Sequence, residues 1–132
     1  MGIRVVRLGT RRTRGEGLRI GTVRLPPRGV PKAKFASQDW FDVWLPNLAP
    51  SLGTMKLARG AKTPSEWAKF VRKYKAEMKA PEPSHLLELL AALSHQASFS
   101  VGCYCENEDR CHRSVLRTLL AERGAKLESM DR

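Results

Sequence analysis

The sequence has 132 residues, a mass of 14.8 kDa and a formal net charge of +11 at pH 7, which is the size of one ordinary domain. Its hydrophobic fraction of 42% and its three tryptophans exclude a disordered chain. No apolar run is long enough to span a bilayer, and the first residues lack the pattern of a secretion signal. We therefore expect a single cytoplasmic domain over residues 1–132 that does not engage a membrane.

Positive charge is concentrated at the front of the chain. Residues 1–34 carry ten arginine or lysine residues against a single acidic residue, Glu16. A basic region of this density favours polyanionic partners, which include phosphorylated small molecules, nucleotides and nucleic acid. Composition leaves open the alternative that these residues form a solvated basic face.

The first third of the chain contains two strand candidates, at residues 3–8 and 18–25. The double proline at 26–27 ends the second strand, because proline removes a backbone donor. A basic loop with Arg28 follows, and Gly29 supplies the backbone freedom that a tight turn needs.

An aromatic cluster comes next, with Trp40, Phe41 and Trp44 within five residues. The spacing predicts a short helix over residues 37–45 whose rings lie in the core, and a ligand-stacking surface is the alternative. Residues 46–62 are predicted to form a loop, and a loop of that length is either functional or mobile.

The strongest helix start combines Thr63 as a cap, Pro64 in the first turn and Glu66 three residues after the cap. This pattern predicts a helix over residues 63–79. The remaining elements are expected as a helix at 84–96, an apolar strand at 97–103, a helix at 111–123 and a last strand at 126–130.

Strands that alternate with helices predict an α/β fold, namely a small, largely parallel sheet flanked by helices in a three-layer, Rossmann-like single domain. In such sheets the ligand crevice lies beyond the carboxyl ends of the strands. Three segments should therefore meet there: the loop after the first strand, the loop carrying Arg28 and Gly29, and residues 103–113.

All three cysteines lie in the stretch 103–113, together with His112 and Arg113. Their crowding suits a thiol or metal site in a reducing compartment better than a disulfide framework. If this protein catalyses a reaction, we expect the chemistry here.

The first interpretation of this stretch is an anion site with a reactive thiol. Cys111 falls at a helix start, where free amides and the helix dipole favour negative charge and lower the pKa of a thiol. Cys111 would be the nucleophile and His112 the acid or base. The anion site would comprise Arg12, Arg28, Gly29, Arg113 and Arg117, of which the last two lie four residues apart on one helical face.

The second interpretation is a zinc site made by Cys103, Cys105, Cys111 and His112, since thiolates and imidazole are the ligands that zinc prefers. Against it, the adjacent Cys111 and His112 should point their side chains apart at a helix start. No cofactor is therefore favoured, and zinc is the alternative. In a purely structural role, Cys103 and Cys111 would fill space as small apolar side chains.

Several motifs together resemble a known family. The run Cys103…Cys111-His112-Arg113 followed by Val115-Leu116 resembles the Cys-His-Arg signature of domain-of-unknown-function family 488, particularly its YeaO-like members. The other similar stretches are Gly17-Leu18-Arg19-Ile20, Pro27-Arg28-Gly29-Val30, Trp44-Leu45, Leu48-Ala49-Pro50-Ser51 and Trp67…Phe70…Tyr74…Glu77.

This resemblance implies a small cytoplasmic α/β domain and supports Arg28, Gly29, Cys111, His112 and Arg113 as site residues. It implies no reaction, because the family has no settled activity. The chain departs from the family at residues 23–26, where relatives often carry aspartate, arginine and tryptophan before the proline and this chain keeps only the arginine. Cys105 also stands where many relatives carry another residue.

The leading hypothesis is a protein that binds a phosphorylated ligand, nucleotide or nucleic acid at the Cys-His-Arg site and acts on it through a thiol. A non-enzymatic nucleic-acid binder that uses the N-terminal arginines, and a zinc-binding domain, are the alternatives. The sequence leaves open whether the protein is an enzyme.

Overall fold

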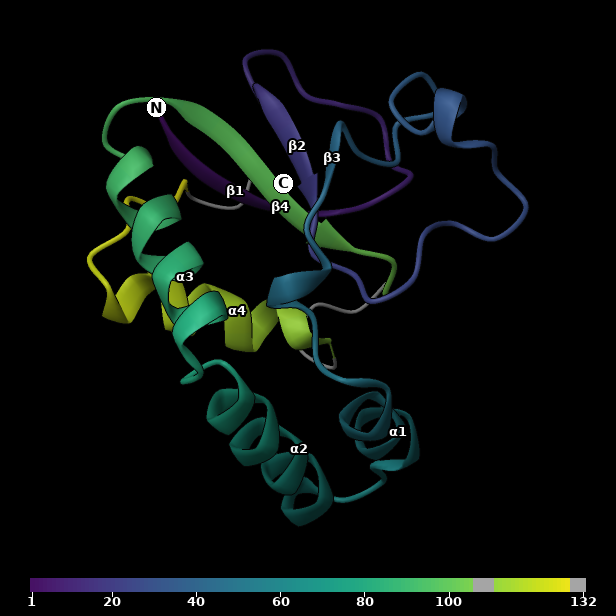
Figure 1. The fold of residues 1–132 in the computed structure, drawn as a ribbon, viewed down its shortest axis with the longest axis vertical. Coiled ribbons are helices and arrows are strands. Elements are labelled where there is room, and N and C mark those ends of the chain that lie inside the picture. The colour runs from purple at the N-terminus through teal and green to yellow at the C-terminus, as the bar shows by residue number, and fades with distance from the viewer. Residues whose placement is uncertain (106–110, 129–132) are drawn as a thin grey trace.

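The computed structural model describes residues 1–105 and 111–128 (Figure 1). Its centre is a parallel four-stranded sheet with the strand order β1-β4-β2-β3. The strands are β1 (Gly2–Arg7), β2 (Leu18–Gly21), β3 (Val43–Trp44) and β4 (Ser98–Cys103). The predicted small parallel sheet flanked by helices is therefore confirmed.

The central strand β4 is buried along most of its length, and its side chains alternate between the two faces of the sheet. Phe99 and Val101 belong to the main hydrophobic core, whereas Ser100 contacts Glu16 on the other face. Gly102 is required by close packing, because a Cβ atom there would lie 2.5 Å from the carbonyl oxygen of Val6.

The helices pack on one face of the sheet (Figure 1). They are α1 (Leu52–Gly60), α2 (Pro64–Glu77), α3 (Pro81–Leu93) and α4 (His112–Glu122). The capping box predicted for Thr63 and Glu66 is present at the start of α2. The main core lies between these helices and the sheet, and its fully buried members include Ile3, Leu48, Phe70, Tyr74, Leu87, Val101, Leu116 and Leu120.

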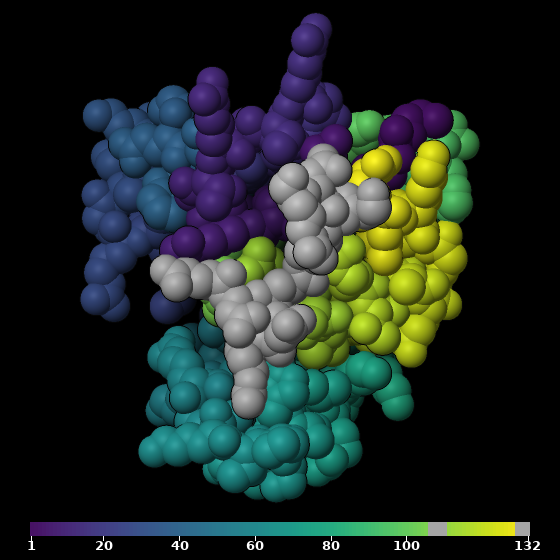
Figure 2. All heavy atoms as spheres, turned by 180° about the vertical axis from the view of Figure 1, so that it is seen from behind, coloured from purple at the N-terminus to yellow at the C-terminus, as the bar shows by residue number. Residues whose placement is uncertain are grey.

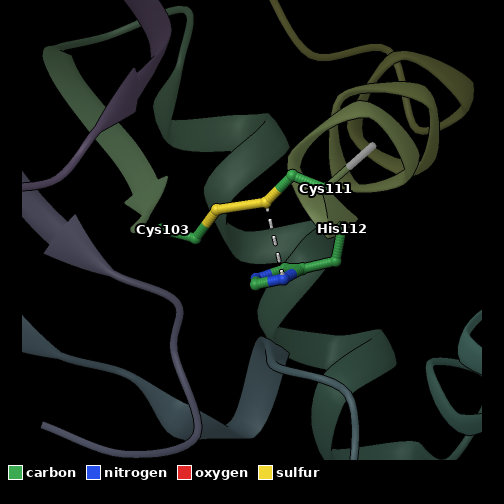
Figure 3. A group of neighbouring side chains, drawn as sticks. All are labelled: Cys103, Cys111 and His112. Carbon is green, nitrogen blue, oxygen red and sulfur yellow. Dashed lines mark hydrogen bonds between the residues drawn. A yellow bond between two sulfur atoms is a disulfide. The ribbon is translucent and has the colours of Figure 1, made fainter. Parts of the chain in front are cut away.

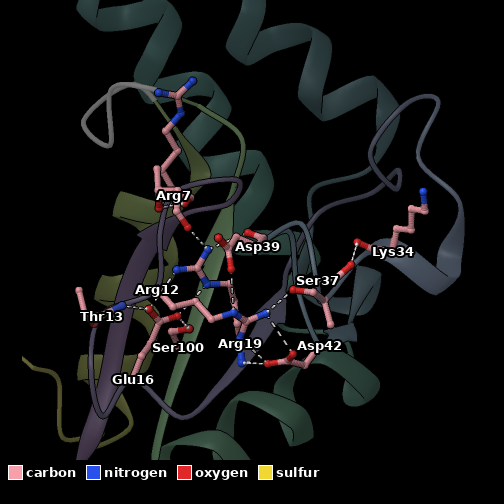
Figure 4. A network of polar contacts seen from close by, with 12 residues as sticks. Arg7, Arg12, Thr13, Glu16, Arg19, Lys34, Ser37, Asp39, Asp42 and Ser100 are labelled. Carbon is pink, nitrogen blue, oxygen red and sulfur yellow. Dashed lines mark hydrogen bonds and ion pairs between the residues drawn. The ribbon is translucent and has the colours of Figure 1, made fainter.

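Loop segments, rather than helices, form the layer on the opposite face of the sheet. Their centre is a buried ion pair between Glu16 and Arg19, to which Ser100 of β4 donates a hydrogen bond (Figure 4). Phe41 also lies in this layer and packs against Gly21 of β2.

The predicted helix over residues 37–45 is wrong. The chain turns at Asp39, whose φ is 61°, and Asp42 then exchanges hydrogen bonds with the backbone of Arg19, its side chain accepting and its own N–H donating. The segment therefore runs beside β2 and ends as the edge strand β3. Of the three aromatic residues Phe41 is in the core, whereas Trp40 is half-buried and Trp44 is 41% exposed.

Residues 46–62 were predicted as a loop, but they contain the short 3-10 helix Pro46–Leu48 and the helix α1. Ser51 caps α1 by accepting a hydrogen bond from the Thr54 amide. At the other end of the chain, Leu127 forms a parallel bridge with Ile3, and residues 129–130 of the predicted last strand lie outside the described residues. In the described part of the chain, no helix has the length and apolar character needed to cross a membrane.

Candidate functional site

A cavity of about 590 Å³ lies at the carboxyl ends of β1, β2 and β4, as expected for a parallel sheet. The loops after these strands supply most of its wall, and α1 closes one side. Among the described residues that line it are four arginines and no aspartate or glutamate. The arginines are Arg7, Arg24, Arg28 and Arg59.

Two of these arginines are held by backbone carbonyls. Arg24 donates to the carbonyl oxygens of Ala49 and Pro50 at 2.8 and 3.2 Å, and Arg7 donates to that of Tyr104 at 3.2 Å. A carbonyl oxygen carries no net charge, so its bonds orient the guanidinium of Arg24 without neutralising it.

The other two arginines reach the cavity from separate segments. Arg28 lies in the loop after β2, Arg59 lies on the last turn of α1, and both side chains are exposed. No hydrogen bond or ion pair ties either of them to another described residue. They are therefore the two guanidinium groups best placed to bind an anion from solvent.

The rest of the wall is largely apolar and partly aromatic. Trp40 and Tyr104 meet edge to face with ring centroids 5.9 Å apart, and Leu52 and Met55 come from α1. The Tyr104 hydroxyl donates to the carbonyl of Leu25, and burial raises the pKa of Tyr104 to about 12. A ligand with an apolar or planar part therefore has a surface to rest on.

The helix α1 is held in place by Glu77 at the end of α2. Its carboxylate accepts hydrogen bonds from the Ser51 amide, the Ser51 hydroxyl and the Thr54 hydroxyl. Burial opposes ionisation of Glu77, but these bonds outweigh burial and lower its pKa. Glu77 thus fixes the wall of the cavity that carries Arg59.

At the inner end of the cavity Cys103, Cys111 and His112 form a buried group (Figure 3). Their sulfur and nitrogen atoms all lie within 4.8 Å of one another. Cys103 ends β4, Cys111 occupies the N-cap position before α4, and His112 is the first residue of that helix. Cys103 and His112 line the cavity, whereas Cys111 does not.

The prediction that the side chains of Cys111 and His112 point apart is wrong. Cys111 is an extended residue, with φ −130° and ψ 154°, and the helical geometry begins only at His112. This change of backbone conformation brings the two side chains to the same side, with Sγ of Cys111 4.0 Å from Nδ1 of His112. The argument from adjacency against a metal site therefore does not hold.

The imidazole of His112 has a defined tautomer. Its Nε2 lies 2.7 Å from the carbonyl oxygen of Thr22, and a carbonyl can only accept, so Nε2 carries the hydrogen. The pKa of His112 is lowered to about 4, chiefly by burial; the bond to Thr22 opposes this shift and the positive charge of Arg113 adds to it. At neutral pH His112 is uncharged, and the lone pair of Nδ1 faces the sulfur atoms.

The structure joins the sulfur atoms of Cys103 and Cys111 in a disulfide (Figure 3), whereas the sequence favoured a thiol or metal site. Their Cα atoms lie 7.8 Å apart, which exceeds the roughly 4.4–6.8 Å of most disulfides. Cys105 is exposed and is not part of the buried group, so it does not join the other cysteines as a fourth predicted ligand.

The remaining predicted anion ligands lie outside the cavity lining. Arg12 is paired with Asp42 at 2.7 Å and with Asp39 at 3.3 Å (Figure 4). Arg113 is buried and donates to the carbonyl of Cys105, and Arg117 is half-buried on α4. Gly29 follows Arg28 in an exposed turn with φ 75°. Within the predicted stretch 103–113, residues 106–110 lie outside the described residues.

Four residues that line the cavity were not predicted from the sequence, namely Arg7, Arg24, Arg59 and Tyr104, and Trp40 was predicted there only as the alternative to a core position. One signal could have pointed to Arg59. Ser51 is a residue type preferred at a helix N-cap, and it does cap α1. A helix that starts there would place Arg59 near the strand ends.

Comparison with known proteins gives a match to one family. The model of the family DUF488-N3a, described as the active DUF488-N3 subclade, matches residues 3–124. This match confirms the resemblance to family 488 seen in the motifs. No curated protein and no solved structure gives a significant match.

Proposed function

This chain belongs to the DUF488-N3a family, and we propose that it binds a phosphorylated ligand, of the nucleotide class or a nucleic-acid end, in the arginine-lined cavity. We further propose that the group of Cys103, Cys111 and His112 acts on that ligand. One observation carries the proposal. Among the described residues, the cavity is lined by four arginines and by no aspartate or glutamate, and it reaches the buried group of two cysteines and one histidine. The description of the subclade as active agrees with a chemical role.

The charge of the cavity supports an anionic ligand. Arg28 and Arg59 approach from two segments and have no other described partner. Guanidinium groups bind phosphate oxygens through paired, charge-assisted hydrogen bonds. A phosphate group between them would be bound from two sides.

The apolar wall supports a ligand that is larger than inorganic phosphate. Trp40, Tyr104 and Met55 offer surface to a planar or apolar group, and stacking on an aromatic ring contributes about 1–3 kcal/mol per base. A nucleotide has both parts, a phosphate for the arginines and a base for this wall.

The group of Cys103, Cys111 and His112 lies at the inner end of the cavity, where a bound phosphorylated ligand would contact it. Nδ1 of His112 lies 4.0 Å from Sγ of Cys111, so its lone pair is placed to accept the S–H of the reduced thiol, and we assign His112 the role of the base. Cys111 was the predicted nucleophile, but Cys103 and His112 are the members that line the cavity. Within the buried group, Cys103 is therefore the thiol that lines the cavity, and the exposed Cys105 also lines it.

A binding titration of the reduced protein tests this proposal. The ligands are a nucleoside monophosphate, the nucleoside without phosphate, inorganic phosphate and a short single-stranded oligonucleotide, each measured by calorimetry. We expect the nucleotide to bind at least about tenfold more tightly than the nucleoside, because each charge-assisted hydrogen bond contributes about 1.5–3 kcal/mol. Equal affinity for nucleotide and nucleoside, or no binding of any phosphorylated ligand, would contradict the proposal.

A second candidate function, non-enzymatic binding of nucleic acid, is favoured by the surface of the N-terminal third. Long side chains of that segment project from the molecule in the space-filling view (Figure 2), and Arg11 and Arg14 are exposed. In that case the oligonucleotide would bind most tightly, its affinity would fall steeply with salt, and substitution of the cysteines would leave it unchanged.

A further inference from the structure

We propose that reduced Cys103, Cys111 and His112 bind one zinc ion, and that the ion's fourth coordination position opens into the arginine-lined cavity. The binding of the ion rests on the geometry of the three side chains. Its use in catalysis, with an oxygen of the ligand or a water molecule in the fourth position, rests on the proposed function.

The three side chains have the composition and placement of a zinc site. Two thiolates and one imidazole are donors that zinc prefers, and all three ligand atoms lie within 4.8 Å of one another. Two rigid elements supply them, since Cys103 ends a central strand and the other two begin α4. Each of the three residues is less than 5% exposed.

The surroundings of His112 orient it as a ligand. Metal-binding histidines usually donate their second ring N–H to a carbonyl or carboxylate, which fixes the ring. Here Nε2 donates to the carbonyl of Thr22, and the ring also meets Tyr74 edge to face at 5.7 Å. Nδ1 is left to face the two sulfur atoms, which is where the ion would lie.

The site differs from a structural zinc site in the number of ligands. Structural zinc takes four protein ligands, whereas catalytic zinc takes three and keeps one position for water or substrate. Cys105 does not join the group, and two of its three members line the cavity. Two thiolates balance the charge of Zn²⁺, so the ion would leave the attraction of the arginines for phosphate unchanged.

Binding requires the reduced state, because the structure joins the two sulfur atoms. Two molecules of a small thiol would reduce the disulfide by exchange, which yields the Cys103 and Cys111 thiols and one molecule of the small thiol's own disulfide. Zn²⁺ then displaces one proton from each thiol and accepts a lone pair from Nδ1 of His112. No further oxidant or reductant is needed.

The test measures zinc per chain after reduction with a phosphine, addition of zinc and gel filtration under anaerobic conditions. We expect about one zinc per chain for the wild type, less than about a tenth of that for Cys103→Ser, Cys111→Ser and His112→Gln, and about one for Cys105→Ser. The Cys105→Ser variant is the matched control, because it removes a neighbouring thiol that is exposed and outside the group. No zinc in the reduced wild type, or unchanged zinc in Cys103→Ser, would overturn the proposal.

Two further measurements distinguish loss of the metal site from misfolding of a variant and from loss of nucleotide binding. Cobalt(II) added to the reduced wild type should give thiolate-to-metal charge-transfer absorption, and its absence would overturn the thiolate ligation. Arg28→Gln should keep its zinc while it loses affinity for the nucleotide. Zinc without nucleotide binding would refute the proposed function alone, and nucleotide binding without zinc would refute the metal site alone.

Discussion

Glu16 and Arg19 form a buried ion pair on the loop-covered face of the sheet (Figure 4). Both carboxylate oxygens accept from the guanidinium, at 2.7 and 3.0 Å, and Ser100 donates to one of them at 2.6 Å. Arg19 also donates to the carbonyls of Thr10 and Asp39, which ties two loops together. A buried charge pair is stable only when its hydrogen bonds are satisfied in this way.

This pair predicts a loss of stability in acid. Burial opposes ionisation of Glu16, but hydrogen bonds from Arg19 and Ser100 outweigh it and lower its pKa to about 2 from 4.5, with Arg12 as a further nearby positive charge. A lowered folded-state pKa contributes stability that is complete above pH 4.5 and is lost as the pH falls toward 2. We expect the free energy of unfolding to fall by about 3 kcal/mol across that range.

Chemical denaturation at several pH values measures this loss, with Glu16→Gln as the comparison. The variant should be less stable than the wild type at pH 7 by about 3–5 kcal/mol, because it leaves the Arg19 charge buried without its partner. It should also lose less stability between pH 5 and 2. Parallel pH profiles for the two proteins would show that Glu16 is not the group responsible.

The sequence identified Glu16 only as the single acid among the first 34 residues. Its partners could not be inferred, because Ser100 is 84 positions away and Arg19 reaches it across a turn. Cys111 and His112 illustrate the same limit, since their convergence depends on one backbone angle at the helix start.

At the scale of secondary structure, α1 is a helix whose local sequence signal is weak and which is stabilised by a tertiary contact. Residues 46–62 contain Gly53 and Gly60 and were predicted to form a loop. The helix forms because Ser51 caps it and Glu77 of α2 holds its first turn. By contrast, α2 has a strong local signal in its capping box and was predicted correctly.

Loosening this anchor should affect both stability and ligand binding. In Glu77→Gln the carboxylate loses one acceptor oxygen, so at least one hydrogen bond from Ser51 or Thr54 is broken. We expect a loss of about 1–3 kcal/mol in the free energy of unfolding and weaker nucleotide binding, because Arg59 and Met55 lie on α1. Glu88→Gln, on the exposed side of α3, serves as the control. Unchanged nucleotide affinity in Glu77→Gln would argue against α1 as a wall of the binding site.

Two glycines should respond to alanine in opposite directions. Gly53 lies in α1, and a Cβ atom there would meet nothing within 4 Å, so Gly53→Ala should stabilise the protein by about 0.5–1 kcal/mol. Gly102→Ala should destabilise it by more, because its Cβ would meet the backbone of β1. Urea denaturation of both variants checks this, and a stabilising Gly102→Ala would contradict the packing of β1 on β4.

At the scale of the whole molecule, the order of strands and helices was enough to predict the parallel sheet and a cavity at the carboxyl ends of its strands. Parallel strands place all their carboxyl ends at one edge, so the loops after β1, β2 and β4 had to meet. Which residues line the cavity was harder to predict. Arg12 proved to be paired with acids, whereas Arg59 and Trp40 came from segments whose structure was assigned incorrectly.

We propose that the cavity binds a phosphorylated ligand through Arg28 and Arg59. Calorimetric titration of a nucleoside monophosphate into the reduced wild type, Arg28→Gln, Arg59→Gln and Arg14→Gln tests it most directly. Arg14 is exposed and outside the cavity lining, so its variant controls for the loss of one positive charge. We predict at least about a tenfold loss of affinity for Arg28→Gln and for Arg59→Gln, and less than twofold for Arg14→Gln. Equal losses in all three variants would mean that net charge, and not this cavity, attracts the ligand, and would contradict the account.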